Sequence, residues 1–285
     1  MDSEQFGFFE FTPEAALDTK LVRSLLAEAE QAAGRVDAVV LPEAAVRHTE
    51  IALLERALAE HGVGLLIAGV GGRAALGAGR NDLHFGVHTT AGWVRFLQHK
   101  HHRWCLDEEQ IRQYHLSRSL DPRKLWWEAI GLYERELNVI SLGAGVTATA
   151  LVCEDLASLD EWAELVRSMG PSLVVALLLD GPQLAARWPC RYSSVLVDDP
   201  GSAVLTLTAY GMVARSRPPG FPRSCAVAHW NSRADGVREL ALAPRASGLL
   251  LSLQTKSSTL WTADGRPHPN VPQLALHSVR QLGRG

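Results

Sequence analysis

Apolar residues fall into short runs separated by glycine, proline and polar residues along most of the chain. Such runs are typical of buried strands when turn-forming residues bound them. The run 173–179 is apolar throughout, so we expect it in the interior of a sheet. The pattern predicts strands over residues 6–11, 36–42, 65–70, 81–88, 92–97, 146–152, 173–179, 202–209, 225–230, 238–242 and 249–255.

Segments with apolar residues at helical spacing alternate with these strands. One helix is expected from Pro13 or Leu17 to about Ala33, because Thr12 is a candidate cap and Gly34 is a natural stop. The pattern predicts further helices over residues 49–61, 106–137 with a break at Pro122, 158–169, 183–197 and, weakly, in the proline-rich tail after Gly265.

Strands that alternate with helices and with paired strands indicate an α/β fold. Nothing marks a linker or an internal repeat, so we expect a single domain over residues 1–285. With 47% hydrophobic residues, the chain can bury a sizeable core. A formal net charge of -3 gives no electrostatic reason to expect binding to nucleic acid or to a membrane surface.

The cysteines are widely spaced and form no Cys-x-x-Cys pair: Cys105, Cys153, Cys190 and Cys225. No secretory leader is apparent, and no apolar run reaches the roughly 18 residues that span a bilayer. We therefore expect a soluble cytoplasmic protein with reduced thiols.

Three chemically active side chains follow strand-like runs. Glu43 closes the run 36–42, Lys100 lies beyond the run 92–97, and Cys153 ends the run 146–152. The ends of neighbouring strands can meet at one edge of a sheet, which would place a carboxylate, an ammonium and a thiol together. Each residue alone is more often structural than functional, since isolated buried cysteines are usually inert.

Two other motifs carry weaker signals. The glycines between Gly69 and Gly79 lack the Gly-Lys-Ser/Thr ending of a phosphate loop, so a flexible turn is the better interpretation. His99, His101 and His102 suggest a metal, but their spacing matches no zinc motif, and adjacent strand positions point to opposite faces. A structural role, or tuning of a pocket near Lys100, is the better interpretation.

The strand endings, in this order, resemble the nitrilase (carbon–nitrogen hydrolase) superfamily over roughly residues 6 to 260. The motifs are Leu41-Pro42-Glu43, then Lys100, then Ala150-Leu151-Val152-Cys153-Glu154-Asp155. The resemblance implies a four-layer-forming α-β-β-α sandwich, a Glu–Lys–Cys triad and a second glutamate, for which Glu128 has the expected place before Cys153. It implies no cofactor and no metal.

The sequence also departs from the family pattern. Glu128 follows Lys100 at a longer distance than usual, which indicates an insertion at about 105–126, close to the mouth of the pocket. Residues 208–211 replace the usual Asn-x-x-Gly. The run 98–104 also resembles, faintly, part of the nitrilase-like domains that accompany reverse transcriptases in bacterial defence systems.

These residue types suit attack on poorly electrophilic amide or nitrile carbons. Glu43 would take the proton of Cys153, and Lys100 would lower the thiol pKa and face the oxyanion. The backbone N–H of Glu154 would be a second oxyanion donor. Glu128 would position the substrate or relay a proton. His101 and Trp127 are further candidates for substrate binding.

The first hypothesis is a hydrolase that cleaves a non-peptide linear amide, carbamoyl or nitrile bond through a Cys153 thioester. A small-molecule substrate and a homo-oligomer are implied by the resemblance alone. The second hypothesis is a catalytically silent accessory or binding module of the same fold that works with a partner protein, as in a defence system. The two differ in whether the triad assembles and whether the insertion fills the pocket.

Overall fold

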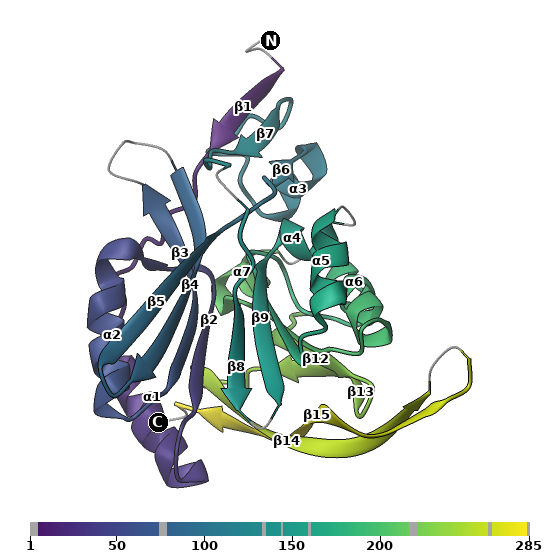
Figure 1. The fold of residues 1–285 in the computed structure, drawn as a ribbon. Coiled ribbons are helices and arrows are strands. Elements are labelled where there is room, and N and C mark those ends of the chain that lie inside the picture. Colours follow the sequence, from purple (N-terminus) through teal and green to yellow (C-terminus); the bar gives the residue numbers. More distant parts are fainter. Residues whose placement is uncertain are drawn as a thin grey trace.

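Two β-sheets pack face to face between two layers of helices in the computed structural model of this chain (Figure 1). The structure describes residues 5–73, 79–132, 135–143, 145–158, 161–216, 222–261 and 264–283. The four layers form an α-β-β-α sandwich, which confirms the predicted fold class. The core between the sheets unites Ile67 and Phe85 of one sheet with Val152 and Val175 of the other.

The first sheet has four strands in the order β2-β3-β4-β5. Successive side chains of a strand point to opposite faces. Leu65 and Ile67 therefore enter the core between the sheets, whereas Leu66 and Ala68 pack beneath the helices. This part of the chain comprises α1 (Thr19–Ala33), β2 (Ala38–Arg47), η1 (His48–Glu50), α2 (Ile51–Glu60), β3 (Leu65–Arg73), β4 (Gly79–Thr89) and β5 (Gly92–His99).

The second sheet has six strands in the order β13-β12-β11-β10-β9-β8, with β9, β10 and β11 parallel. The carboxyl ends of these parallel strands lie at one edge of the sheet, near Lys100, which directly follows β5 of the first sheet. This part comprises β8 (Val139–Gly143), β9 (Val146–Val152), α4 (Glu154–Ala157), α5 (Glu161–Met169), β10 (Leu173–Leu178), α6 (Trp188–Asp198), β11 (Ala203–Thr208), α7 (Tyr210–Arg215), β12 (Ala226–Ser232) and β13 (Gly236–Ala241).

A small third sheet lies at one end of the sandwich, at the top of Figure 1. It joins β1 (Phe6–Phe9), β7 (Leu125–Glu128) and β6 (Cys105–Leu106), and α3 (Glu108–Gln113) follows β6. The third sheet and α3 together contain much of the 105–126 segment. Its apolar side chains pack on Leu179, directly after β10, in one cluster: Trp104, Leu106, Ile111 and Tyr114.

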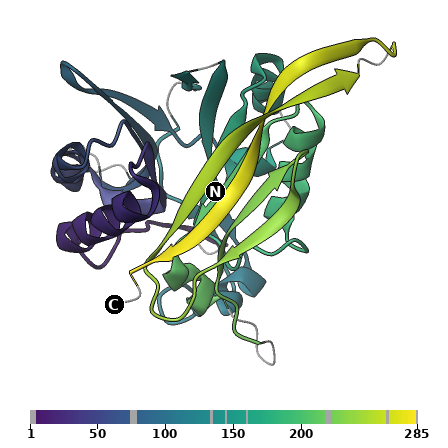
Figure 2. The same cartoon turned by 90° about the horizontal axis from the view of Figure 1, so that it is seen from below.

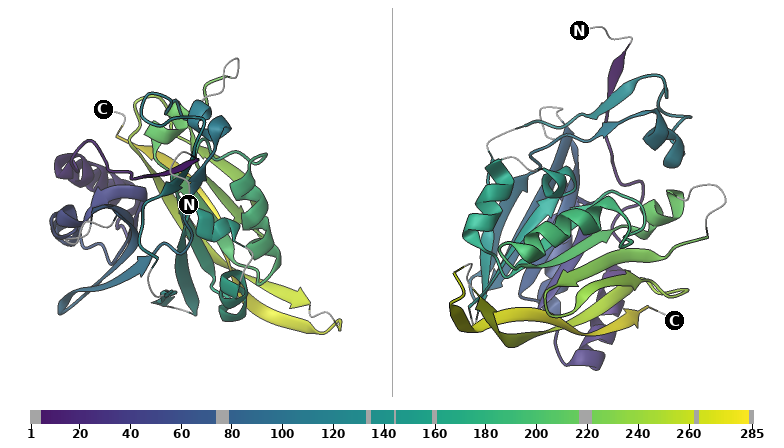
Figure 3. Two further views of the ribbon diagram at one scale, coloured as in Figure 1. Left: turned by 90° about the horizontal axis from the view of Figure 1, so that it is seen from above. Right: turned by 90° about the vertical axis from the view of Figure 1, so that its right-hand side faces the viewer.

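The chain ends in a long two-stranded antiparallel ribbon, β14 (Gly248–Trp261) and β15 (Pro267–Leu282). Figures 2 and 3 show that one end of the ribbon lies against the sandwich and the other projects away from it. The buried residues Ala275 and Leu276 belong to the part that packs on the body.

Several predicted elements differ from the structure. The helix before Ala33 begins only at Thr19, because Asp18 caps it by accepting the N–H groups of Lys20 and Leu21. The tail after Gly265 was expected to be weakly helical, but its residues pair with β14 as a strand. That prediction was wrong because the long-range pairing outweighs the local propensity.

The predicted helix over 106–137 was also wrong for most of its length. Only Glu108–Gln113 is helical, with Asp107 as its cap. The tryptophan-rich stretch Leu125–Glu128 is a strand that pairs in parallel with β1. Tyr133, at the end of that expected helix, lies outside the described residues.

The described helices include none that is both long enough and apolar enough to span a membrane.

Candidate active site

Glu43 lies on a bulge in β2. The pairing of β2 with β3 shifts register between Leu41 and Val46, and Ala44, the residue after Glu43, has a positive φ of 51°. Gly69 on β3 permits this bulge, because a Cβ there would overlap with Glu43 Cα and the Pro42 carbonyl. The bulge presents a carboxylate that is only 1% exposed to Asn81 and Lys100.

Cys153 occupies a sharp turn between β9 and α4. Its φ of 44° and ψ of -104° are unusual for a residue with a side chain. Its backbone N–H donates to the Leu177 carbonyl of β10 at 2.9 Å, which fixes the start of the turn. Strained backbone of this kind is concentrated at functional sites, where the surrounding structure holds it in place.

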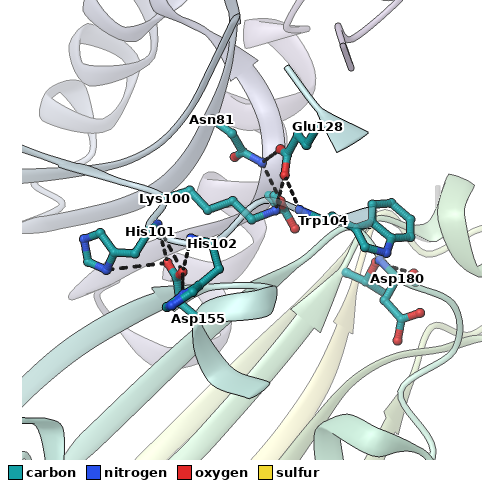
Figure 4. A network of polar contacts seen from close by, with 10 residues as sticks. Asn81, Lys100, His101, His102, Trp104, Glu128, Asp155 and Asp180 are labelled. Carbon is teal, nitrogen blue, oxygen red and sulfur yellow. Dashed lines mark hydrogen bonds and ion pairs between the residues drawn. The ribbon is translucent and has the colours of Figure 1, made fainter. Parts of the chain in front are cut away.

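Lys100 joins two buried carboxylates. Its Nζ donates to Glu43 Oε1 at 3.0 Å and to Glu128 Oε2 at 2.7 Å (Figure 4). The lysine side chain is fully buried, and the two carboxylates are almost so. Because a buried ammonium needs compensating negative charge, this geometry holds Lys100 in its charged form.

Asn81 completes the network. Its Nδ2 donates to Glu43 Oε1 at 2.5 Å and to Glu128 Oε1 at 2.7 Å. The backbone N–H of Trp104 donates to Glu128 Oε2 at 3.1 Å. One amide and one ammonium therefore link both carboxylates into a closed ring of hydrogen bonds. Figure 4 labels Asn81, Lys100 and Glu128 of this ring. Asn81 is not among the candidates expected from the sequence, because its only signal there is a polar residue at the start of a predicted strand.

The electrostatics favour a neutral thiol at rest. Burial raises the pKa of Cys153 well above its usual value, and Glu43 adds to this, while Lys100 acts in the opposite direction. Lys100 lowers the thiol pKa as expected, but burial and Glu43 together outweigh this effect. Burial opposes the charge on Lys100, but Glu128 and Glu43 outweigh it, and its pKa is raised.

Glu43 has the properties of a proton acceptor for this thiol. Burial raises the pKa of Glu43, and Lys100 offsets part of that effect. Its Oε1 accepts the hydrogen bonds from Asn81 and Lys100. Its Oε2 has no hydrogen-bond partner among the described residues. A carboxylate oxygen without a partner, near a buried thiol, is suited to general base catalysis.

Glu154 begins the short helix α4 directly after Cys153. Its side chain is half-buried, and burial raises its pKa while Lys100 opposes that effect. As the first residue of this helix, it has a backbone N–H of the kind that finds no acceptor within the helix itself. That N–H therefore stays available as the oxyanion donor that the sequence suggests.

His101 lies beside Asp155 rather than within the ring of hydrogen bonds. The Asp155 carboxylate accepts the backbone N–H groups of His101 at 3.1 Å and of His102 at 3.0 Å (Figure 4). The His101 Nδ1 atom is 4.0 Å from Asp155 Oδ2, and burial lowers the pKa of this imidazole. Asp155 therefore anchors the turn that follows Lys100.

The structure does not bring Trp127 to the other candidates. On β7 the side chains alternate, so Glu128 is buried while Trp127 is 39% exposed. The expectation of substrate binding by Trp127 finds no support for this reason. Trp126 lies on the other face of β7 and packs in the cluster of the 105–126 segment.

Two histidines of the run 98–104 contact two different carboxylates. His99 Nδ1 contacts Asp82 at 2.7 Å, and His102 Nδ1 contacts Asp155 at 2.9 Å. The residues that the structure describes include no group of three or more side chains arranged to hold a metal ion. The other motif with a weak signal, the glycine-rich stretch, largely extends β3 and β4, and its residues 74–78 lie outside the described part.

The site is closed in this structure. Cys153 is 3% exposed, and the Glu128 side chain only 8%. Trp104 directly precedes the 105–126 segment, and Tyr114 belongs to it. Both are buried in the cluster that covers the end of β10. The segment thus covers the side of the sandwich on which the thiol lies.

Comparison with solved structures places the fold among nitrilase-superfamily proteins. Nit3 of Saccharomyces cerevisiae, a member of branch 10 of the nitrilase superfamily, superposes with a TM-score of 0.53 and 11% identity, over 79% of this chain and 80% of that one. An amidase of Nesterenkonia from the nitrilase superfamily gives a TM-score of 0.50 and 13% identity, over 96% of this chain and 88% of that one.

Glutamine-dependent NAD+ synthetase of Acinetobacter baumannii is a further similar structure, with a TM-score of 0.45 and 14% identity over 83% of this chain. This chain spans 47% of the length of that synthetase. No family model matches the sequence, and no curated protein matches it either. The chain therefore shares the fold of nitrilase-superfamily proteins without close sequence similarity to them.

Proposed function

We propose that this protein is a carbon–nitrogen hydrolase that cleaves a non-peptide linear amide, carbamoyl or nitrile bond through a thioester on Cys153. One observation carries the proposal: an ammonium, Lys100, lies between two buried carboxylates, Glu43 and Glu128, beside a thiol on a strained turn. A purely structural role does not account for four such groups at one buried place, because burying charge is costly.

In the proposed first half-reaction, Glu43 accepts the thiol proton as the Cys153 sulfur attacks the amide carbon. The tetrahedral oxyanion is stabilised by Lys100 and the Glu154 backbone N–H. The C–N bond then breaks, Glu43 passes its proton to the departing nitrogen, and an amine or ammonia leaves. A thioester on Cys153 remains.

In the second half-reaction, Glu43 takes a proton from a water molecule that attacks the thioester carbonyl. The C–S bond breaks, Cys153 recovers a proton from Glu43, and a carboxylic acid leaves. Glu128 holds Lys100 in position through its 2.7 Å contact. Its second oxygen, bound to Asn81, keeps the carboxylate oriented throughout.

Substrate entry requires movement of the 105–126 segment, because the thiol is buried beneath it. Loops that close over an active site and complete its arrangement of groups are a common device in enzymes. We therefore assign this segment the role of a lid over the proposed site.

The burial of Cys153 also favours a second candidate function. A catalytically silent module of the same fold, working with a partner protein, would retain the network for stability and keep the thiol inaccessible. The two candidates differ in one measurable property, the reactivity of Cys153.

Alkylation by iodoacetamide, followed by intact mass and peptide mapping, tests the proposal. The reagent is itself a small primary amide, so it fits a pocket built for amides. We expect Cys153 to be modified first and the reaction to slow in Glu43→Gln and Lys100→Met. Cys225→Ala, at a free cysteine outside the 105–126 segment, is the control and leaves the rate unchanged. Labelling of Cys153 that is slower than that of Cys105 and unaffected by either substitution favours the silent module.

A further inference from the structure

A further acid, Asp180, lies at the same edge of the sheet as Cys153. The strands β9 and β10 run parallel, with Val152 opposite Leu177, so both end toward the same edge. Cys153 follows the first strand directly, and Asp180 follows the apolar end of the second. Asp180 is 3% exposed and acts electrostatically on the Cys153 thiol. It lies outside the ring formed by Lys100 and the two glutamates (Figure 4).

The carboxylate of Asp180 is only half satisfied. Its Oδ1 accepts a hydrogen bond from the Tyr114 hydroxyl at 2.6 Å and one from Arg187 Nη2 at 2.7 Å. Its Oδ2 is buried and has no hydrogen-bond partner among the described residues. An acceptor left in that condition costs free energy, so a buried carboxylate oxygen without a partner indicates a missing donor.

The chain is built to hold this carboxylate in place. Asp180 exchanges hydrogen bonds with Thr208, through its own N–H and carbonyl group. At the next position, Gly181 allows Arg187 to lie close, because a Cβ there would overlap with the guanidinium and with Ser216. Arg187 is therefore held on the Oδ1 side, which leaves Oδ2 for another donor.

The charges around the thiol also favour a cation. Three carboxylates act on Cys153, those of Glu43, Glu154 and Asp180, and the ammonium of Lys100 opposes them. Arg187 pairs with Asp180 through Oδ1. Lys100 is neutralised by its own pair of glutamates. An incoming molecule with a positive charge gains from this field, whereas a second anion is repelled.

We propose that Asp180 Oδ2 binds a protonated amino group on the acyl part of the substrate, so that the site selects amides whose acyl chain carries an amine. This specificity rests on the proposed hydrolase function. The reacting carbonyl lies at Cys153 between Lys100 and the Glu154 N–H, and the amino end reaches the neighbouring strand end at Asp180.

The test compares two thiol reagents of similar size at Cys153: aminoethyl methanethiosulfonate, which is cationic, and propyl methanethiosulfonate, which is neutral. In both, the cysteine sulfur attacks the reagent's sulfenyl sulfur, a disulfide forms and methanesulfinate leaves. The rates are measured by intact mass. We expect the wild-type protein to favour the cationic reagent about tenfold, the size of one modest charge interaction.

Asp180→Asn removes the charge while keeping the shape, and we expect it to bring the ratio of the two rates close to one. Because Tyr114 donates to Asp180, the variant can also change how readily the site opens. Such a change alters both rates alike and cancels in the ratio, and the melting temperature reports whether the variant is folded. Asp37→Asn, at an exposed aspartate, is the matched control and keeps the wild-type ratio. Glu154→Gln tests the competing acid. A ratio unchanged in Asp180→Asn, or lost only in Glu154→Gln, overturns the assignment.

Hydrolysis provides the second measurement, with β-alaninamide and butanamide as a pair of nearly equal shape. We expect a preference for the amine in kcat/KM that disappears in Asp180→Asn through KM. If butanamide is cleaved as well as β-alaninamide, the hydrolase proposal stands and the subsite is overturned. If neither amide is cleaved and Cys153 reacts with neither thiol reagent, the proposed function itself fails.

Discussion

The carboxylate of Asp155 accepts the backbone N–H of His101 at 3.1 Å, and this bond joins the two halves of the site. His101 follows the lysine at the end of the first sheet, and Asp155 follows the nucleophile at the end of the second. Gln98 makes a similar connection, since its Nε2 donates to the Ala150 carbonyl of β9 at 3.0 Å. These bonds set the distance between Lys100 and Cys153, although none of them touches the reacting atoms.

Replacing Asp155 by alanine is expected to lower the free energy of unfolding by about 3 kcal/mol, because it leaves buried N–H groups without an acceptor. Chemical denaturation measures this. We also expect slower alkylation of Cys153 in the folded variant. Asp37→Ala, at an exposed position, should change neither quantity, and equal effects at both positions would contradict the role of Asp155.

Asn81→Asp is expected to slow the alkylation of Cys153 by about a hundredfold, the usual size of a general base contribution. The substitution replaces an amide donor by an oxygen facing two carboxylates, which then repel it and lose one of the two donors that they share. Asn231→Asp is the control, since Asn231 is a buried asparagine that contacts Ser193 and Ser194 instead. An unchanged rate in Asn81→Asp would show that the ring is not needed for reactivity.

Gly69→Ala is expected to abolish activity and to destabilise the protein, because the added methyl group must displace the backbone at Glu43. Gly64→Ala is a close control on the same part of the chain, where the nearest atom to an added Cβ is 3.6 Å away. Activity and melting temperature of the two variants make the comparison. Full activity in Gly69→Ala would contradict the role of the bulge.

Tyr114→Phe is expected to speed the alkylation of Cys153 about fivefold, because the loss of roughly 1 kcal/mol of hydrogen bonding to Asp180 eases opening of the lid. Tyr210→Phe, at a half-exposed tyrosine, is the control. A slower reaction in Tyr114→Phe would mean that the 105–126 segment supports the site and does not restrict access to it.

His229 makes stability depend on pH. Burial lowers its pKa from 6.5 to about 4. The unfolded chain therefore binds a proton before the folded one does, and the stabilising contribution present above pH 6.5 is lost as the pH falls toward 4. The full loss is about 3 kcal/mol. Denaturation curves at several pH values should show a weaker acid dependence in His229→Gln than in the wild type.

Glu43 and Cys153 were predictable from the sequence because both follow a clear apolar run, and the end of a strand is a local pattern. The same rule applies to Asp180, which closes the run 173–179, but no other motif drew attention to it. Asn81 gave almost no signal. Its importance depends on two partners, Glu43 and Glu128, that lie far away in the sequence.

Glu128 shows the limit of reasoning from spacing. The resemblance to a known family points to it, whereas the pattern of the residues around it predicts a helix. In the structure it belongs to β7, whose partner strand β1 lies near the start of the chain, far from β7 in the sequence. The prediction of a helix in the tail after Gly265 was wrong for the same reason, because β15 is a strand only through its pairing with β14. Local propensity does not reveal such partners.

A double-mutant cycle on the alkylation rate of Cys153 tests the central claim most directly. The proteins are the wild type, Glu43→Gln, Lys100→Met and the double variant, each checked by its melting temperature. If the base and the ammonium act as one unit, each single change lowers the rate at least about tenfold and the double change lowers it little further. Effects that simply add, or rates equal to the wild type, would contradict an assembled catalytic site.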